Sequence, residues 1–119
     1  DILIGFGGDD LLVGGAGRDT LLGGSGRDVL LGGADDDWIL GGSGADFAAG
    51  GGGADRVFGG RGDDELDGGA DDDRLWGQRG ADVLFGSWGD DVLIGGRGAD
   101  ELHGGPGHDR LIPTASLSR

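Results

Sequence analysis

A nine-residue phrase recurs along this chain without insertion or deletion. Twelve consecutive phrases run from Gly5 to Ile112, and residues 1–4 fit the last four positions of an earlier phrase. A repeat this short cannot bury a core by itself, so successive copies must stack on one another and share one. The strict periodicity therefore argues against the disordered linker that 33 glycines in 119 residues would otherwise suggest.

Three positions of the phrase are mostly glycine. Position 1 is glycine in all twelve phrases, position 2 in nine and position 4 in ten. Glycine allows positive φ and close backbone approach, so positions 1 to 6 predict a tight loop rich in exposed carbonyl groups. The departures are Phe6, Gln78 and Ser87 at position 2, and Asp35 and Asp71 at position 4.

The last three positions predict a short strand, because they are rich in Val, Ile, Leu, Phe and Trp. A strand alternates its faces, so position 8 faces one way and positions 7 and 9 face the other. Two phrases then make one turn of a coil, with their strands on opposite walls and position 8 inside. The expected inward residues are Leu3, Leu12, Leu21, Leu30, Ile39, Ala48, Val57, Leu66, Leu75, Leu84, Leu93, Leu102 and Leu111.

Position 6 is aspartate in every phrase. Strands of a sheet lie ~4.8 Å apart, so the position-6 carboxylates of phrases n and n+2 face each other across about that distance. Two such charges repel by roughly 1 to 4 kcal/mol, depending on the effective dielectric constant. The aspartates are Asp10, Asp19, Asp28, Asp37, Asp46, Asp55, Asp64, Asp73, Asp82, Asp91, Asp100 and Asp109.

A calcium ion between each stacked pair would convert this repulsion into attraction. Ca²⁺ takes six to eight hard oxygen ligands, and a glycine-rich loop with one aspartate offers both carboxylate and carbonyl oxygens. We therefore interpret the twelve aspartates as metal ligands, each using one oxygen toward the ion above and one toward the ion below. Five gaps along each edge give about ten ions. Ten divalent ions would change the formal charge from −14 to about +6, and folding is expected to depend on them.

The phrase resembles a known repeat. "GGAGRDTLL" (14–22), "GGSGRDVLL" (23–31) and "GGRGADELH" (95–103) are similar to the GGxGxDxUx calcium-binding nonapeptide of the hemolysin-type repeats-in-toxin (RTX) proteins. The resemblance implies an all-β parallel β-roll of residues 1–112, a two-sheet right-handed β-helix with 18 residues per turn and calcium between its stacked loops. It also implies type I secretion and folding in extracellular calcium. Residues 113–119 are expected to form a short flexible tail.

Composition narrows the context. The chain has no cysteine, which excludes disulfides and thiolate metal sites. Its acidic balance disfavours nucleic acid and anionic membrane as partners and favours cations. No apolar run approaches the ~20 residues of a membrane span. Because the sequence has no methionine and opens on "DILIG", we interpret it as part of a longer protein.

Motifs for catalysis do not occur in the sequence. There is no HExxH, no lysine for a phosphate-binding loop and no serine in a plausible triad. The two histidines, His103 and His108, fall at an outward strand position and at a loop tip, where surface roles are expected. The chain is therefore not expected to be an enzyme by itself.

Position 9 of the even phrases is apolar throughout, with Leu22, Leu40, Phe58, Trp76 and Ile94 on one wall. This row fits ordinary strand propensity, with nearby arginines partly covering it. It also fits an interface with another domain of the parent protein or with a second copy. The sequence leaves both open.

Three function classes follow from these observations. The first is a calcium-dependent folding, secretion and stability module of a larger secreted protein. The second is an adhesive or surface-binding module that uses an apolar outer face. The third is a non-catalytic portion of a secreted protease, lipase or epimerase. The sequences flanking this chain would discriminate best among them.

Overall fold

Thirteen short strands make up the part of the chain that the structure describes. The computed structural model describes residues 1–113, which contain strands and no helix, and residues 114–119 of the expected tail lie outside the described residues. No described segment is an apolar helix of membrane-spanning length. The strands are β1 (Ile2–Ile4), β2 (Leu11–Gly15), β3 (Thr20–Leu22), β4 (Val29–Gly33), β5 (Trp38–Ser43), β6 (Phe47–Gly51), β7 (Arg56–Arg61), β8 (Glu65–Gly69), β9 (Arg74–Arg79), β10 (Val83–Phe85), β11 (Val92–Arg97), β12 (Glu101–His103) and β13 (Arg110–Ile112).

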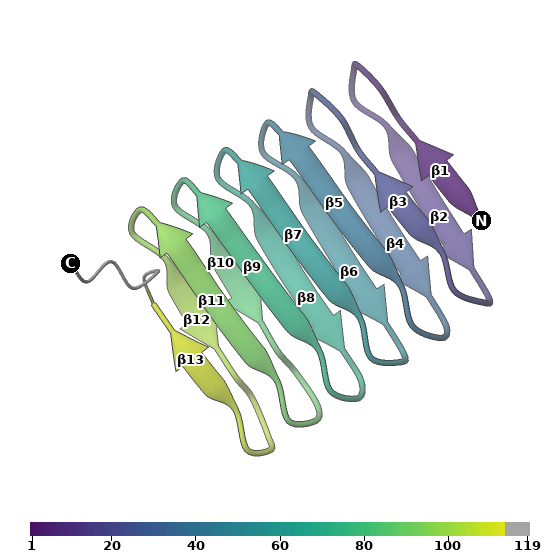
Figure 1. Cartoon of the computed structure of the whole chain (residues 1–119). Helices are drawn as coiled ribbons and strands as arrows, with labels where there is room; N and C mark the ends of the chain where they lie inside the picture. Colours follow the sequence, from purple (N-terminus) through teal and green to yellow (C-terminus); the bar gives the residue numbers. More distant parts are fainter. Residues whose placement is uncertain (114–119) are drawn as a thin grey trace.

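Every strand pairs in parallel with a strand two positions away in the chain order. Odd-numbered strands form a seven-stranded sheet, β1-β3-β5-β7-β9-β11-β13, and even-numbered strands form a six-stranded sheet, β2 to β12. The register is constant at 18 residues, as in Ile39 opposite Val57 and Val57 opposite Leu75. The chain therefore winds as a solenoid with two strands per turn, and successive turns lie side by side along its axis (Figure 1). The prediction of an all-β roll with 18 residues per turn is confirmed.

Position 8 fills the space between the two sheets. Ten of the thirteen expected inward side chains are buried, from Leu12 to Leu93. Leu3 and Leu102 pack against this core and are partly buried, whereas Leu111 is 44% exposed. Leu3 and Leu111 lie on the two end strands of the seven-stranded sheet, where one side of the layer has no neighbouring turn.

Glycine has two different roles in the loops. Positions 2 and 4 adopt positive φ, and the residues that replace glycine there keep it, with φ of 71° at Phe6, 74° at Asp35 and 76° at Gln78. Position 1 does not have positive φ. Its glycines face the position-6 carboxylates, so they are needed for space and not for backbone freedom.

The apolar row lies in register along the outer face of the seven-stranded sheet, as predicted. Leu22, Leu40, Phe58, Trp76 and Ile94 are successive partners across this sheet, and each is half-buried. The Phe58 and Trp76 rings stack with centroids 4.4 Å apart and planes 4° apart. The row thus covers part of its own apolar surface.

Candidate metal centre

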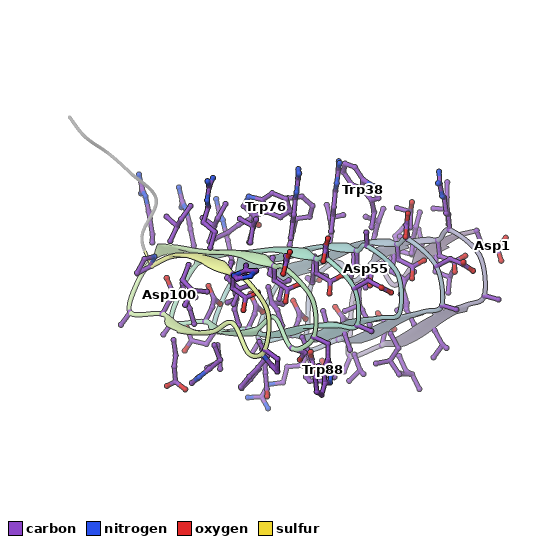
Figure 2. All side chains as sticks on the ribbon, turned by 90° about the horizontal axis from the view of Figure 1, so that it is seen from below. Asp1, Trp38, Asp55, Trp76, Trp88 and Asp100 are labelled. Atoms are coloured by element: carbon purple, nitrogen blue, oxygen red, sulfur yellow. The ribbon has the colours of Figure 1, made fainter. Side chains whose placement is uncertain are left out.

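The structure gathers the predicted carboxylates into two columns, one along each edge of the roll where the chain turns from one sheet to the other. Odd and even phrases supply one column each, and Figure 2 shows carboxylate side chains inside the coil near Asp55 and Asp100. Those in the middle of the columns are almost completely buried, and Asp10, Asp100 and Asp109 at the ends are half-buried. The buried members are Asp19, Asp28, Asp37, Asp46, Asp55, Asp64, Asp73, Asp82 and Asp91.

One carboxylate oxygen of ten of the twelve column members is held by a backbone N–H of the preceding turn. The N–H of Asp37 donates to Oδ1 of Asp55, and the N–H of Asp55 donates to Oδ1 of Asp73, both at 2.8 Å. Ten such bonds, all 2.8 Å long, run along the two columns. The ladder fixes each carboxylate at one strand spacing from the next.

The other oxygen has no partner. In eleven column members, from Asp10 to Asp100, Oδ2 is buried and accepts no hydrogen bond. An unsatisfied buried polar atom costs about 1–3 kcal/mol, and more when it is charged. Two columns of such atoms therefore favour the binding of cations beside them.

Carbonyl oxygens converge on the same place. A Cβ added to Gly59 would lie 2.6 Å from Oδ2 of Asp64 in the same phrase and 2.9 Å from the carbonyl oxygen of Gly77 in the next turn. Gly32 shows the same arrangement with Asp37, at 2.6 Å, and the Gly50 carbonyl, at 2.7 Å. The missing side chain of position 1 thus leaves a small space lined by a carboxylate oxygen and a carbonyl oxygen.

Burial makes the columns costly to ionise in the metal-free roll. It is the main cause that raises the pKa of Asp73 to about 9, that of Asp64 to about 8 and that of Asp55 to about 7. Backbone hydrogen bonds lower these pKa values, and neighbouring carboxylates raise them further. At the sites nearer the ends, burial raises the pKa of Asp46 and Asp91 only to about 6.

The available donors fit calcium. Within residues 1–113 no three Asp, Glu, His or Cys side chains surround one point, so each turn offers one carboxylate and the remaining donors are carbonyl oxygens. Hard, uncharged oxygens beside a carboxylate suit Ca²⁺, which tolerates irregular geometry, better than they suit a transition metal that prefers nitrogen or sulfur. The column aspartates and position-1 carbonyls would hold the ions, which supply the positive charge that the buried Oδ2 atoms lack.

Comparison with known families agrees with this geometry. Four copies of the RTX calcium-binding nonapeptide repeat match the chain, at residues 1–21, 13–48, 49–84 and 85–113. The chain belongs to the RTX calcium-binding nonapeptide repeat family. No curated protein matches it. Membership confirms the resemblance seen in the sequence and shows that this RTX chain is a calcium-binding repeat module.

A second set of carboxylates takes part in the RTX loops and was not predicted from the sequence. Position-5 aspartates are exposed, yet Oδ1 of Asp36 accepts the N–H of Ala54 and Oδ1 of Asp72 accepts the N–H of Asp90, both at 2.8 Å. In these bonds a carboxylate at position 5 accepts the N–H of position 5 in the following turn. In the position-6 ladder, by contrast, a carboxylate accepts the N–H of position 6 in the preceding turn. The only indication of this second set in the sequence was an aspartate at position 5 in five of the twelve phrases.

Both histidines lie away from the columns. Nε2 of His103 lies 2.7 Å from Oε2 of Glu101, on an exposed part of β12, and His108 is an exposed loop residue. Their positions agree with the predicted surface roles.

Position 1 provides a specific test of the cation space. Gly59→Ala would place a methyl group 2.6 Å from Oδ2 of Asp64, so we expect at least a tenfold weaker calcium affinity at that turn, because ligand displacement costs more than ~1.4 kcal/mol. Gly52→Ala is the control, because its added Cβ meets nothing within 4 Å and its φ is not positive. Calcium titrations of the two variants that superimpose would contradict a site at position 1.

The raised pKa values predict that acid stabilises the metal-free roll. Between about pH 4 and pH 9 the folded chain binds more protons than the unfolded chain, because burial raises the folded pKa of Asp73 from 3.8 to about 9. The free energy of unfolding therefore falls as pH rises through this range. In excess chelator, the β signal in circular dichroism should therefore be larger near pH 5 than near pH 8. A β signal that grows as pH rises in chelator would show that the columns are not buried without metal.

Proposed function

We propose that this chain is a calcium-triggered folding module of a larger secreted protein, unfolded where calcium is scarce and folded where it is abundant. The observation that carries the proposal is the pair of carboxylate columns with eleven buried, unpartnered Oδ2 atoms. Without cations these atoms oppose folding. With cations they hold each turn to the next.

Family membership supports the cellular context. RTX repeats are typical of secreted bacterial proteins, which agrees with an extracellular location. A chain that stays unfolded at low calcium suits passage through a secretion channel, and extracellular calcium then drives folding after export. In this proposal the module contributes no catalytic group and serves the folding and stability of the domains attached to it.

The number of ions tests the proposal directly. Equilibrium dialysis in about 1 mM calcium should find about ten ions bound per chain and none after chelation. Magnesium should fail to replace them, because it requires near-ideal octahedral geometry and gives up water reluctantly. Binding of one or two ions, or equal binding of magnesium, would contradict a module built on repeated calcium sites.

A further inference from the structure

Charge is distributed unevenly over the two sheets, although the chain as a whole carries −14. The strands of the seven-stranded sheet contain no aspartate or glutamate and six of the nine arginines, whereas those of the six-stranded sheet contain Glu65, Asp67 and Glu101 and no arginine. We call the outer surface of β5 to β13 in the larger sheet the arginine face. Its arginines are Arg56, Arg61, Arg74, Arg79, Arg97 and Arg110.

The arginines border this face on both sides. Strands β7 and β9 each begin and end with an exposed arginine, and the register places Arg56 beside Arg74 and Arg61 beside Arg79. The two borders are about 16 Å apart, because each strand advances five residue steps from one arginine to the other. Figure 2 shows nitrogen-tipped side chains projecting on the side that carries Trp38 and Trp76, while Trp88 projects on the opposite side.

These arginines lack acidic partners within the described residues. Among residues 1–113, none of the six takes part in an ion pair within 4.0 Å. The exposed Asp36, Asp72 and Asp90 line one groove together with Arg56 and Arg74, and their Oδ1 atoms accept backbone N–H groups of the next turn. Like charges on neighbouring strands repel one another, so the arginine borders favour an anionic partner.

The residues between the borders indicate the kind of partner. The ring faces of Phe58 and Trp76 are stacked on each other, and Arg56 lies over the Trp38 ring at 5.0 Å. These ring faces are therefore already in use and offer few platforms for stacking a nucleic-acid base. Their edges, together with half-buried Leu40 and Ile94, form an apolar strip between two cationic borders.

We propose that the arginine face docks the calcium-loaded roll on an anionic lipid surface. The roll measures 36 × 27 × 20 Å, which is broad enough for both arginine borders, about 16 Å apart, to contact one extended plane. Arginines reach lipid phosphates with their long side chains, and tryptophan favours the headgroup level. Bound calcium removes the negative charge of the columns that would otherwise repel the bilayer. This inference rests on the calcium-dependent folding proposed above.

Cosedimentation with vesicles tests the inference, using the full chain in about 1 mM calcium. Vesicles of phosphatidylcholine with about 30% phosphatidylserine should bind the chain, and pure phosphatidylcholine should not. Each arginine near an anionic surface contributes about fivefold to partitioning. Arg74→Gln should therefore weaken binding about fivefold and Arg74→Gln with Arg79→Gln about 25-fold. Arg27→Gln, which removes the same charge from a loop beside the six-stranded sheet, should leave binding unchanged.

Circular dichroism of every variant in calcium separates loss of docking from loss of folding. A wild-type chain that folds in calcium but binds no anionic vesicle overturns the docking proposal and leaves the folding proposal intact. Equal loss of binding in Arg27→Gln and Arg74→Gln, or binding that survives both face substitutions, assigns the attraction to net charge or to calcium bridging and also overturns it. Tighter binding to soluble polygalacturonate than to vesicles, lost in Arg74→Gln, assigns the face to a soluble polyanion instead.

Discussion

In excess chelator near pH 8 the chain is expected to lose its β signal, and in millimolar calcium it should regain that signal cooperatively. The reason is that nine carboxylates are buried in the roll, and raised pKa values mean that the metal-free fold must take up protons or bury charge there. The core contains one aliphatic residue per nine-residue phrase, so each turn buries little apolar surface. Calcium therefore decides whether the turns stack.

The measurement is far-ultraviolet circular dichroism during a calcium titration. Half-saturation should fall at about 0.1–1 mM, the range of extracellular calcium modules. Tryptophan emission should follow the same transition, because Trp76 stacks on Phe58 only when β7 and β9 pair. Magnesium at the same concentration is the control and should give little change. A spectrum that is the same in chelator and in calcium would contradict calcium-triggered folding.

The fold could be predicted from the sequence because each phrase is short and repeats without interruption. An 18-residue turn leaves no freedom in strand order: Val57 must lie beside Ile39 and Leu75 once two phrases make one turn. The alternation within three residues then sends position 8 inward. No long-range pairing had to be guessed, which is the step at which sequence reasoning usually fails for sheets of other folds.

The site was predicted less completely. The twelve aspartates follow from their spacing, but the sequence does not show that Oδ1 of Asp55 accepts the N–H of Asp37 while its Oδ2 is left unpartnered. That asymmetry depends on the conformation of the loop backbone, which has positive φ at positions 2 and 4, and the direction of a single N–H cannot be predicted from the repeat pattern. The role of glycine at position 1 could not be predicted either. A sequence does not distinguish a glycine needed for positive φ from a glycine needed for space.

The arginine face could not be predicted from the net charge of the whole chain either. A formal charge of −14 indicates an acidic protein and suggests cationic partners. The structure separates this charge, because the loops that hold most of the acids lie at the edges and the arginines of β7, β9, β11 and β13 lie on one sheet. Net charge governs long-range behaviour, whereas a flat partner senses the one face that it touches.

Asp73→Asn is expected to give the largest effect of any single substitution in the columns. Asp73 is almost fully buried, its Oδ1 accepts the N–H of Asp55, and its Oδ2 is one of the unpartnered oxygens. If each carboxylate bridges two ions, as we propose, the variant should bind about two fewer of the ten ions and need several-fold more calcium to fold. Oδ1 can serve in this way because an oxygen that accepts one N–H keeps a second lone pair.

Asp72→Asn is the matched control for this substitution. It removes the same charge one residue away, from an exposed carboxylate that accepts the N–H of Asp90. Ion counting by calorimetry and the calcium midpoint by circular dichroism should therefore change little in Asp72→Asn and strongly in Asp73→Asn. Loss of one ion in Asp73→Asn would assign binding to Oδ2 alone and contradict the bridge. Equal effects of the two substitutions would contradict the assignment of position 6 as the ligand column. In chelator the order reverses: Asp73→Asn should keep more β signal than the wild type as pH rises from about 5 to 8, because the neutral amide needs no proton on folding, whereas burial raises the pKa of Asp73 to about 9.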